Sequence, residues 1–190
     1  MVGGDVLLAV DDTDAVVGHI SKVAAHRIGT ARQHRAFSLC VLNGDGRLLV
    51  QQRASCKALF PDKWANTCCS HPRATSLAEC VEWNHMGVRT AAQRRVHEEL
   101  GAHVHAFDMR CALRLAYRAQ CDAQWEEWEV DHVLVAWLPR AGSDPLALNL
   151  NPDEVRATRW VTRTEAADLD LASWFAHLLE RADAWWLPSL

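Results

Sequence analysis

The chain has 190 residues, which is the length of one typical domain and enough to bury a sizeable core. Lys and Arg number 20 and Asp and Glu 24, so the net charge is −4, and no basic excess exists to draw the protein onto nucleic acid or an anionic membrane. Hydrophobic residues make up 49% and charged residues 23%, a globular composition that excludes disorder. The unusual counts are seven Cys, nine Trp and a single Tyr, which is Tyr117.

The cysteines indicate a reducing compartment, because an odd number of them cannot all pair within one chain. The first residues carry no basic region, and their only apolar run, Val6–Val10, is too short for a signal peptide. We therefore expect reduced thiols and a cytoplasmic location. The sequence contains no CxxC pair, which argues against a structural zinc ribbon, and no apolar stretch of the ~20 residues needed to span a bilayer.

Short strands alternate with a few helices along the chain, and no linker separates domains. In chain order we expect a strand at Val6–Val10, a short helix at Ser21–His26, a hairpin of Phe37–Leu42 and Arg47–Gln52, a helix from the capping box Thr90–Gln93 to Gly101, strands at Ala112–Arg118, Trp128–Leu138 and Ala157–Val161, and two C-terminal helices, the second from about Leu171 to Trp186. This order predicts an α/β or α+β layered domain.

The first informative block is Trp64–Pro72, in which Cys69 and His71 lie two residues apart. In an extended segment such side chains point to the same side, so the block favours one pocket that receives both. A buried free thiol beside an incidental His is the alternative for this pair taken alone.

The second block places Glu127, Glu129 and Asp131 at alternate positions where an apolar strand begins. Carboxylates on one face of such a strand need compensation, which a metal ion supplies, and a solvated strand end is the alternative. Two histidines precede an earlier strand. A set of three His and two Glu suits Mg²⁺, Mn²⁺ or Zn²⁺, and its members here are His26, His34, His71, Glu127 and Glu129.

The third block, Gln93–Gly101, is similar to the end of the Nudix box, in which helix carboxylates hold Mg²⁺ against a diphosphate. With the box aligned on Arg94, Cys80 stands at its first Gly, Met86 at its first Glu and Arg95 at its second. A diphosphate hydrolase needs those carboxylates for its metals and for activating water. We therefore expect a degenerate box that serves as scaffold and keeps Glu99 as one metal-binding carboxylate.

From about Asp5 to Trp186 the chain resembles type 1 isopentenyl-diphosphate isomerase, a family with the Nudix fold. The matching segments are Lys22–His26, His34–Ser38, Gln51–Ala54 with Lys57, Trp64–Pro72, Gly87–Arg89, Ala91–Arg95, Tyr117–Gln120, Glu127–Glu129 and Ser173–Phe175. The resemblance implies a mixed-sheet sandwich with flanking helices, formed as a single domain over residues 1–190. Its Nudix-like core covers about 35–165 and its C-terminal helices 165–187.

The family interconverts isopentenyl and dimethylallyl diphosphate by adding a proton at one carbon and removing one at another, through a tertiary carbocation. The resemblance implies that Cys69 and Glu129 transfer protons from opposite sides of the substrate, that Tyr117 assists Glu129, and that the indole of Trp174 faces the cation. It also implies a divalent metal on the three His and two Glu, with a second Mg²⁺ between Glu99 and the diphosphate. Ser70 and three cations would bind the diphosphate, namely Lys22, Arg53 and Lys57.

Some roles and two other functions stay open. Arg95 is a further candidate for the diphosphate, and surface salt-bridging is the alternative for Lys57 and Arg95. A Nudix pyrophosphohydrolase acting on a nucleoside diphosphate derivative would release phosphate and tolerate loss of Cys69. A non-catalytic binding module on the same fold would have lost Cys69, Tyr117 or Glu129. We expect the partner to be a small prenyl diphosphate, with neither nucleic acid nor a membrane span involved.

Overall fold

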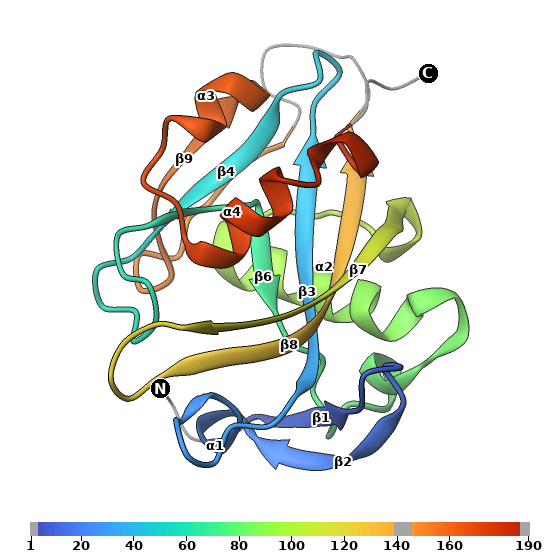
Figure 1. Cartoon of the computed structure of the whole chain (residues 1–190). Helices are drawn as coiled ribbons and strands as arrows, with labels where there is room; N and C mark the ends of the chain where they lie inside the picture. Colours follow the sequence, from blue (N-terminus) through green and yellow to red (C-terminus); the bar gives the residue numbers. More distant parts are fainter. Residues whose placement is uncertain (1–3, 139–145, 187–190) are drawn as a thin grey trace.

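The computed structural model describes residues 4–138 and 146–186 (Figure 1). In chain order its elements are β1 (Val6–Val10), β2 (Val16–Ser21), α1 (Lys22–His26), β3 (His34–Leu42), β4 (Leu48–Arg53), β5 (Trp64–Ala65), β6 (Cys68–Ser70), η1 (Leu77–Cys80), η2 (Trp83–His85), α2 (Met86–Leu100), η3 (Ala106–Asp108), β7 (Met109–Gln120), β8 (Glu126–Trp137), β9 (Val155–Val161), α3 (Arg163–Ala167), α4 (Ser173–Leu179) and η4 (Ala182–Ala184). The expected mixed α+β organisation is confirmed.

Strand β3 is the centre of the sheet, because it pairs with β1, β4, β6 and β8. Its pairing with β8 is parallel and runs in register from His34 opposite Glu129 to Leu42 opposite Trp137. The other named strand pairs of the described residues are antiparallel, including the β3–β4 hairpin and the long β7–β8 hairpin. A parallel pair buried on both faces needs nearly continuous apolar residues, and all of β3 is buried.

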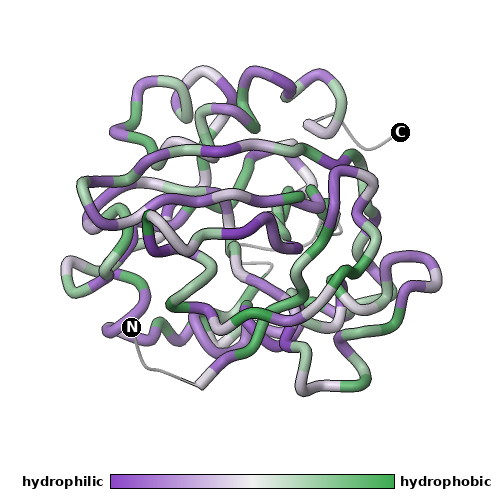
Figure 2. The backbone as a smooth tube through the Cα atoms, turned by 60° about the horizontal axis from the view of Figure 1, so that its bottom comes forward, coloured by the Kyte–Doolittle hydropathy of each residue, from purple (hydrophilic) through white to green (hydrophobic). Residues whose placement is uncertain are grey.

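Helices cover the two faces of the β3–β8 pair, and Figure 1 shows α4 in front of β3 and α2 behind it. On one face Leu39 and Leu134 pack in a core with α2, and on the other Cys40 and Val135 pack with α4. Hydrophobic and hydrophilic residues interchange along the backbone in Figure 2, as the two-residue period of half-buried strands requires. The candidate functional residues lie at the end of β3–β8 that these cores leave open.

Helix α2 begins four residues before the expected capping box, so the prediction of an N-terminus at Thr90 is wrong. The helix is preceded by His85 in a left-handed conformation, with no side-chain cap. Tight packing allows the earlier start. A Cβ atom on Gly87 would lie 2.4 Å from the backbone oxygen of Glu79, so only Gly lets this turn pass so close to η1. The C-terminus at Gly101, whose φ is 64°, agrees with the prediction.

The last helix is shorter than the predicted span of about 171–186. Helix α4 ends at Leu179, and a separate 3-10 turn, η4, follows. The reason lies in Trp185 and Trp186, whose rings are buried against the core and whose indole nitrogens donate to backbone oxygens of Leu178 and Gly46. Continuing one regular helix would not place both indoles on these acceptors.

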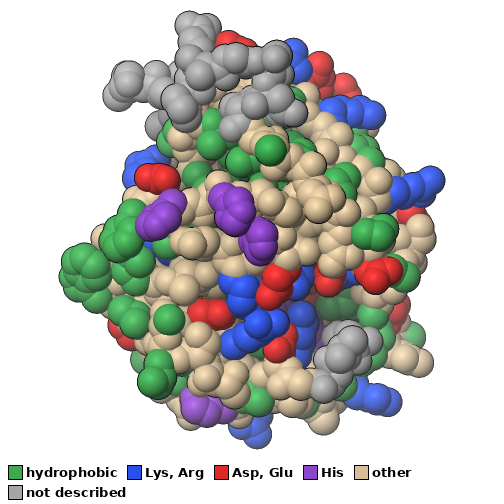
Figure 3. All heavy atoms as spheres, turned by 180° about the vertical axis from the view of Figure 1, so that it is seen from behind, with side chains coloured by type: hydrophobic (Ala, Val, Ile, Leu, Met, Phe, Trp, Pro, Cys, Tyr) green, Lys and Arg blue, Asp and Glu red, His purple; other side chains and the backbone are tan. Residues whose placement is uncertain are grey.

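The surface carries charges of both signs, and Figure 3 shows Lys and Arg side chains intermixed with Asp and Glu on the back of the molecule. This mixture agrees with the small net charge of −4. Over residues 4–138 and 146–186, none of the helices has the length and apolar character that crossing a membrane requires.

Candidate active site

Three histidines and one glutamate meet where β3 and β8 begin. His34 opens β3 and lies opposite Glu129 of β8, because the parallel register pairs these two residues. His26 ends α1, and His71 follows β6, which is paired with β3. One donor atom from each of His26, His34, His71 and Glu129 lies within 4.8 Å of the others, and all four residues are buried. The fold thus gathers four metal-ligating side chains from four separate segments.

Backbone carbonyls orient two of these imidazoles. Nδ1 of His26 lies 2.8 Å from the oxygen of Lys22, and Nδ1 of His34 lies 2.8 Å from the oxygen of Arg32. A carbonyl only accepts, so each Nδ1 donates its proton to the carbonyl and each Nε2 is turned inward. Both Nε2 atoms face Oε1 of Glu129, at 3.7 Å from His26 and 3.5 Å from His34.

The inner surfaces of these side chains fit a divalent cation. Nε2 of His34 is buried without a hydrogen-bond partner, and Nε2 of His71 lies 2.9 Å from Oε1 of Glu129. Lone pairs of two imidazoles and a carboxylate oxygen that face one another repel unless a cation lies between them. Metal-bound His typically donates its outer N–H to a carbonyl, which is the arrangement of His26 and His34. The cluster is therefore compatible with a divalent metal.

Tyr117 joins the two glutamates of β8. Its hydroxyl lies 2.6 Å from Oε2 of Glu129 and 3.0 Å from Oε2 of Glu127. Burial and the charge of Glu129 raise the pKa of Glu127 well above its usual value. Burial alone would also raise the pKa of Glu129, but the three imidazoles that face its Oε1 outweigh burial and lower that pKa. Tyr117 therefore bridges two carboxyl groups of different proton affinity, and Glu127 has the higher pKa of the two.

These residues open into a cavity of about 410 Å³. Its wall combines proton-transfer groups, an indole ring and several cations. The lining residues that bear on its chemistry are Lys22, Ser38, Arg53, Lys57, Cys69, Ser70, His71, Arg95, Glu99, Tyr117, Glu127, Glu129, Glu154 and Trp174. The cavity is large enough for a small-molecule ligand.

Cys69 lies in the middle of β6 and lines the cavity, whereas the neighbouring Cys68 is fully buried in the core beside α2. The two-residue period of a strand explains why adjacent cysteines have opposite surroundings. Burial raises the pKa of the Cys69 thiol, and Arg53 opposes this effect. Cys69 is therefore a protonated thiol in the cavity wall.

Trp174 is held in place from several sides. Its indole Nε1 donates to Oδ1 of Asn66 at 3.0 Å, and Phe60 packs edge-on against the ring at 5.1 Å between centroids. The Asn66 amide donates in turn to the backbone oxygens of Leu39 and Cys68. This chain of contacts ties the indole to β3 and β6. The role of Asn66 was absent from the sequence prediction, although a buried amide in an apolar block signals a need for partners.

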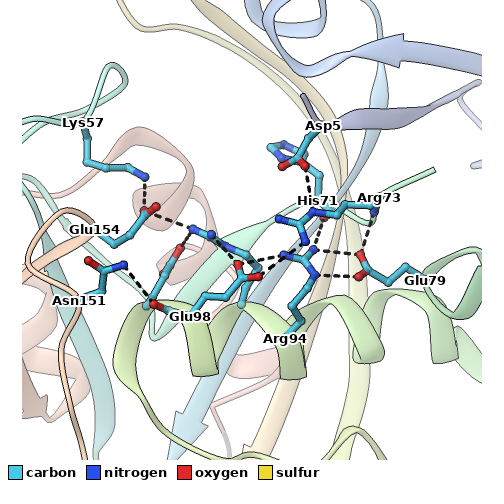
Figure 4. Close-up of polar contacts among 11 residues, drawn as sticks. Asp5, Lys57, His71, Arg73, Glu79, Arg94, Glu98, Asn151 and Glu154 are labelled. Atoms are coloured by element: carbon cyan, nitrogen blue, oxygen red, sulfur yellow. Dashed lines mark hydrogen bonds and ion pairs between the residues drawn. The ribbon is translucent and has the colours of Figure 1, made fainter. Parts of the chain in front are cut away.

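Cations crowd one side of the cavity, and their partner carboxylates lie at its edge (Figure 4). Lys57 pairs with Glu154, and Arg95 contacts both Glu154 and Glu99. Burial lowers the pKa of Lys22, and the charges of Arg95 and Lys57 lower it further. A polyanionic ligand would relieve this repulsion between like charges.

The helix that carries the degenerate Nudix box is held in place by a carboxylate from outside the box. Arg94 makes a two-point ion pair with Glu79, at 2.7 and 2.9 Å, and a further contact with Glu98 at 3.1 Å (Figure 4). Glu79 lies in η1, outside the aligned box, so the sequence prediction missed it. The sequence signal for Glu79 was its position directly before Cys80, the residue aligned with the first Gly of the box.

Comparison with known proteins identifies the family. The NUDIX domain model matches residues 32–182. Isopentenyl-diphosphate Delta-isomerase of Dictyostelium discoideum is 34% identical, over 94% of this chain and 80% of that enzyme. The isomerase II of Clarkia breweri is 35% identical, over 96% and 68% of the two chains.

The chain belongs to the isopentenyl-diphosphate Delta-isomerases of the Nudix superfamily. It spans only 57% of the length of the chloroplastic isomerase I of Arabidopsis thaliana, to which it is 39% identical. Among solved structures, DR0079 from Deinococcus radiodurans superimposes with a TM-score of 0.65 over 93% of this chain and 98% of that chain, at 19% identity. That structural likeness shows a shared fold.

The structure brings most of the site residues expected for an isomerase into one place, with one difference. Glu127 lies outside the four-residue metal cluster, and its carboxylate contacts Tyr117 instead. Glu99 lines the cavity but lies apart from that cluster, where Gln51 donates to it at 3.1 Å and Arg95 pairs with it. The expected diphosphate ligands Lys22, Arg53, Lys57 and Ser70 all line the cavity.

Asp131, next on the same face of β8, predicts a pH dependence of stability. Its Oδ2 accepts from Ser38 at 2.8 Å, while its Oδ1 is buried without a partner. Burial and the charge of Glu129 raise its pKa from 3.8 to about 8. The folded state therefore holds this proton more tightly than the unfolded state. The stabilising contribution is full below pH ~4 and is lost as the pH rises through about 8, at about 1.4 kcal/mol per pH unit.

We expect Asp131→Asn to remove this slope. The free energy of unfolding of the wild type, measured in urea without divalent ions, should fall more steeply between pH 5.5 and 8.5 than that of the variant. Equal slopes for the two proteins would contradict the assignment.

Proposed function

We propose that this chain interconverts isopentenyl diphosphate and dimethylallyl diphosphate by protonating and deprotonating carbon through a tertiary carbocation. The observation that carries the proposal is the content of one cavity: the Cys69 thiol, the Tyr117–Glu129 pair, the Trp174 indole and a group of cations. The family membership adds to it, because the named relatives are isomerases of this type.

The reaction demands such a cavity. An unactivated alkene is a very weak base, so the acid that protonates it must be well placed and shielded from water. We assign the two proton transfers to Cys69 and Glu129 on opposite sides of the substrate. The hydroxyl of Tyr117 donates a hydrogen bond to the carboxylate of Glu129 and also contacts Glu127, so it can pass a proton between the two carboxyl groups.

The carbocation needs an electron-rich wall that does not attack it. The face of Trp174 meets this need, since a desolvated cation–π contact contributes about 2 kcal/mol. In the structure the guanidinium of Arg53 already lies over this ring, 5.2 Å from its centroid. This contact supports a role of the indole face in stabilising positive charge.

The metal at the buried cluster would be held by His26, His34, His71 and Glu129, with Oε1 of Glu127, the oxygen not hydrogen-bonded to Tyr117, as a further ligand. Three nitrogens with carboxylate oxygens suit Mg²⁺, Mn²⁺ or Zn²⁺. A bound ion supplies positive charge that fixes Glu129 and its protonation state. We propose that a separate Mg²⁺ accompanies the diphosphate at Glu99, where Lys22, Arg53, Lys57 and Ser70 bind the phosphate oxygens.

The rival function, pyrophosphate hydrolysis, is not favoured. Met86 and Arg95 stand where a Nudix hydrolase has metal-binding carboxylates. Arg95 also pairs with Glu99, one of the two glutamates of the box that remain. These changes remove the negative charge that would hold the hydrolytic metals and activate water.

We propose a reducing compartment such as the cytoplasm for the protein, because Cys69 must stay a thiol.

Tyr117→Phe tests the relay. The variant keeps the ring but loses the hydroxyl between Glu127 and Glu129, so kcat should fall by about 10²-fold while KM changes little. No second tyrosine complicates the interpretation. A variant with the wild-type kcat would reduce Tyr117 to a packing role.

The function itself is tested by incubating the full chain with isopentenyl diphosphate and Mg²⁺ and separating the products. Dimethylallyl diphosphate should accumulate to equilibrium without release of phosphate. Phosphate release, or no conversion with Mg²⁺, Mn²⁺ or Zn²⁺ across the pH range, would overturn the proposal.

A further inference from the structure

A second group of metal-ligating side chains lies on the other face of β8. His85, Cys111 and His132 each present one donor atom, and the three atoms lie within 4.8 Å of one another. His132 is buried, and His85 and Cys111 are partly exposed, so an ion can reach them from solvent. Glu129 and His132 differ by an odd number of positions in one strand, so their side chains leave β8 on opposite faces. The group is therefore separate from the catalytic cluster.

A β-bulge aligns Cys111 with His132. In the regular part of the β7–β8 ladder Leu113 lies opposite Val133, but the register shifts so that Cys111 lies opposite Leu134. If the ladder had stayed regular through Ala112, Cys111 would lie opposite Val135, on the face of Val133 and Val135 instead. The bulge thus turns the thiol toward the face of His132, which is how bulges re-aim functional side chains.

His85 and two residues near it have backbone conformations in the left-handed region. His85 has φ 58° and the preceding Asn84 has φ 49°. Asp14, which contacts His132, has φ 70°. Such conformations cost non-Gly residues roughly 1–3 kcal/mol each and gather where function maintains them. Three of the five non-Gly residues that the described chain holds at positive φ meet at this one place.

Asp14 fixes the tautomer of His132. Its Oδ2 lies 2.8 Å from Nε2 of His132, and a carboxylate that is also paired with Arg35 accepts that proton. The lone pair of Nδ1 then faces Cys111, whose Sγ lies 4.0 Å away. A His that donates one N–H to a carboxylate and aims its other nitrogen at a thiol has the orientation of a metal ligand with its supporting partner.

We infer that His85, Cys111 and His132 bind a divalent transition-metal ion of the zinc class, with the fourth position left to water. A thiolate and two imidazoles are the donors that Zn²⁺ and Co²⁺ prefer and that Mg²⁺ avoids. Tetrahedral Zn²⁺ would hold such donors about 3.4–3.6 Å apart, so the observed group has to close by about 1 Å. Binding releases the thiol proton of Cys111 to solvent, and no other bond changes.

The bound ion would tie three segments together: the turn before α2, the bulge of β7 and the back of β8. Because metal binds the folded state only, it should raise the melting temperature, and the stabilisation should grow with the logarithm of the free metal concentration above the Kd. This stabilisation is independent of the isomerase proposal, since none of the three ligands lines the catalytic cavity.

Cobalt distinguishes the two sites. The full chain, stripped of metal and supplied with Mg²⁺, is titrated with Co²⁺ while the near-ultraviolet sulfur-to-cobalt charge-transfer absorption is recorded. We expect one saturable thiolate-to-cobalt transition per chain. It should vanish in Cys111→Ser and persist in Cys69→Ser and in Cys121→Ser, a matched cysteine at the far end of β7.

His85→Asn is the second variant, because Asn tolerates the left-handed backbone and its fold is checked by circular dichroism. It should weaken Co²⁺ binding at this site at least about tenfold. Absence of the absorption in the wild type, its survival in Cys111→Ser or its loss in Cys69→Ser would overturn the inference. Isomerase activity enters none of these readouts, so the site and the proposed function fail separately.

Discussion

Cys69→Ala is expected to lower kcat for isomerisation by at least about 10³-fold, because only one of the two proton-transfer groups then remains and the opposite side of the substrate has none. Substrate affinity should change little, since the cations that bind the diphosphate remain. The measurement is the steady-state rate of dimethylallyl diphosphate formation.

Cys68→Ala is the matched control. Cys68 has the same chemistry one position earlier but is buried in the core beside α2. Its loss should cost stability and leave kcat within about threefold of wild type. Equal losses of activity in the two variants would show that the β6 strand, and not the Cys69 thiol, is what the reaction needs.

Glu129→Gln is expected to abolish activity and to release the metal from the buried cluster. One oxygen of Glu129 faces three imidazoles and the other accepts from Tyr117, so this side chain serves both the metal and the proton. A neutral amide removes the ligand charge and cannot accept the proton. Activity should fall by at least about 10³-fold, and metal content after gel filtration should drop.

Glu126→Gln provides the control on the same strand. Glu126 points to the opposite face of β8 and pairs with Arg118, whose side chain is 55% exposed. Glu126 itself is buried, but Gln can still accept a hydrogen bond from Arg118, and neither residue lines the cavity or belongs to the metal cluster, so activity and metal content should stay close to wild type. A Glu129→Gln protein that keeps its metal would contradict the assignment of this residue as a ligand.

The local chemistry of the site could be predicted from sequence because it depends on strand periodicity. The alternation of Glu127 and Glu129 and the spacing of Cys69 and His71 place side chains on one face wherever the strand lies. The hairpin around residues 43–46 and the helix end at Gly101 follow from local turn and capping preferences, and both agree with the structure.

Long-range pairing could not be predicted in this way. His34 meets Glu129 only because β3 and β8 pair in parallel with one particular register. The start of α2 depends on how closely Gly87 packs under η1, which overrode the capping box at Thr90. Similarly, Glu79 reaches Arg94 from a 3-10 turn outside the box. Each of these contacts is set by tertiary packing, which local preference does not encode.

We expect protons to move on and off carbon in the cavity shared by Cys69 and Glu129. The most direct test is to incubate the full chain with isopentenyl diphosphate and Mg²⁺ in D₂O and to locate deuterium in the prenyl diphosphates by NMR. Deuterium should enter the methyl group formed by protonation, at a rate that falls with kcat in Cys69→Ala and Glu129→Gln. Dimethylallyl diphosphate formed without solvent deuterium would contradict these proton transfers. Release of phosphate from substrate that has taken up no deuterium would contradict them as well.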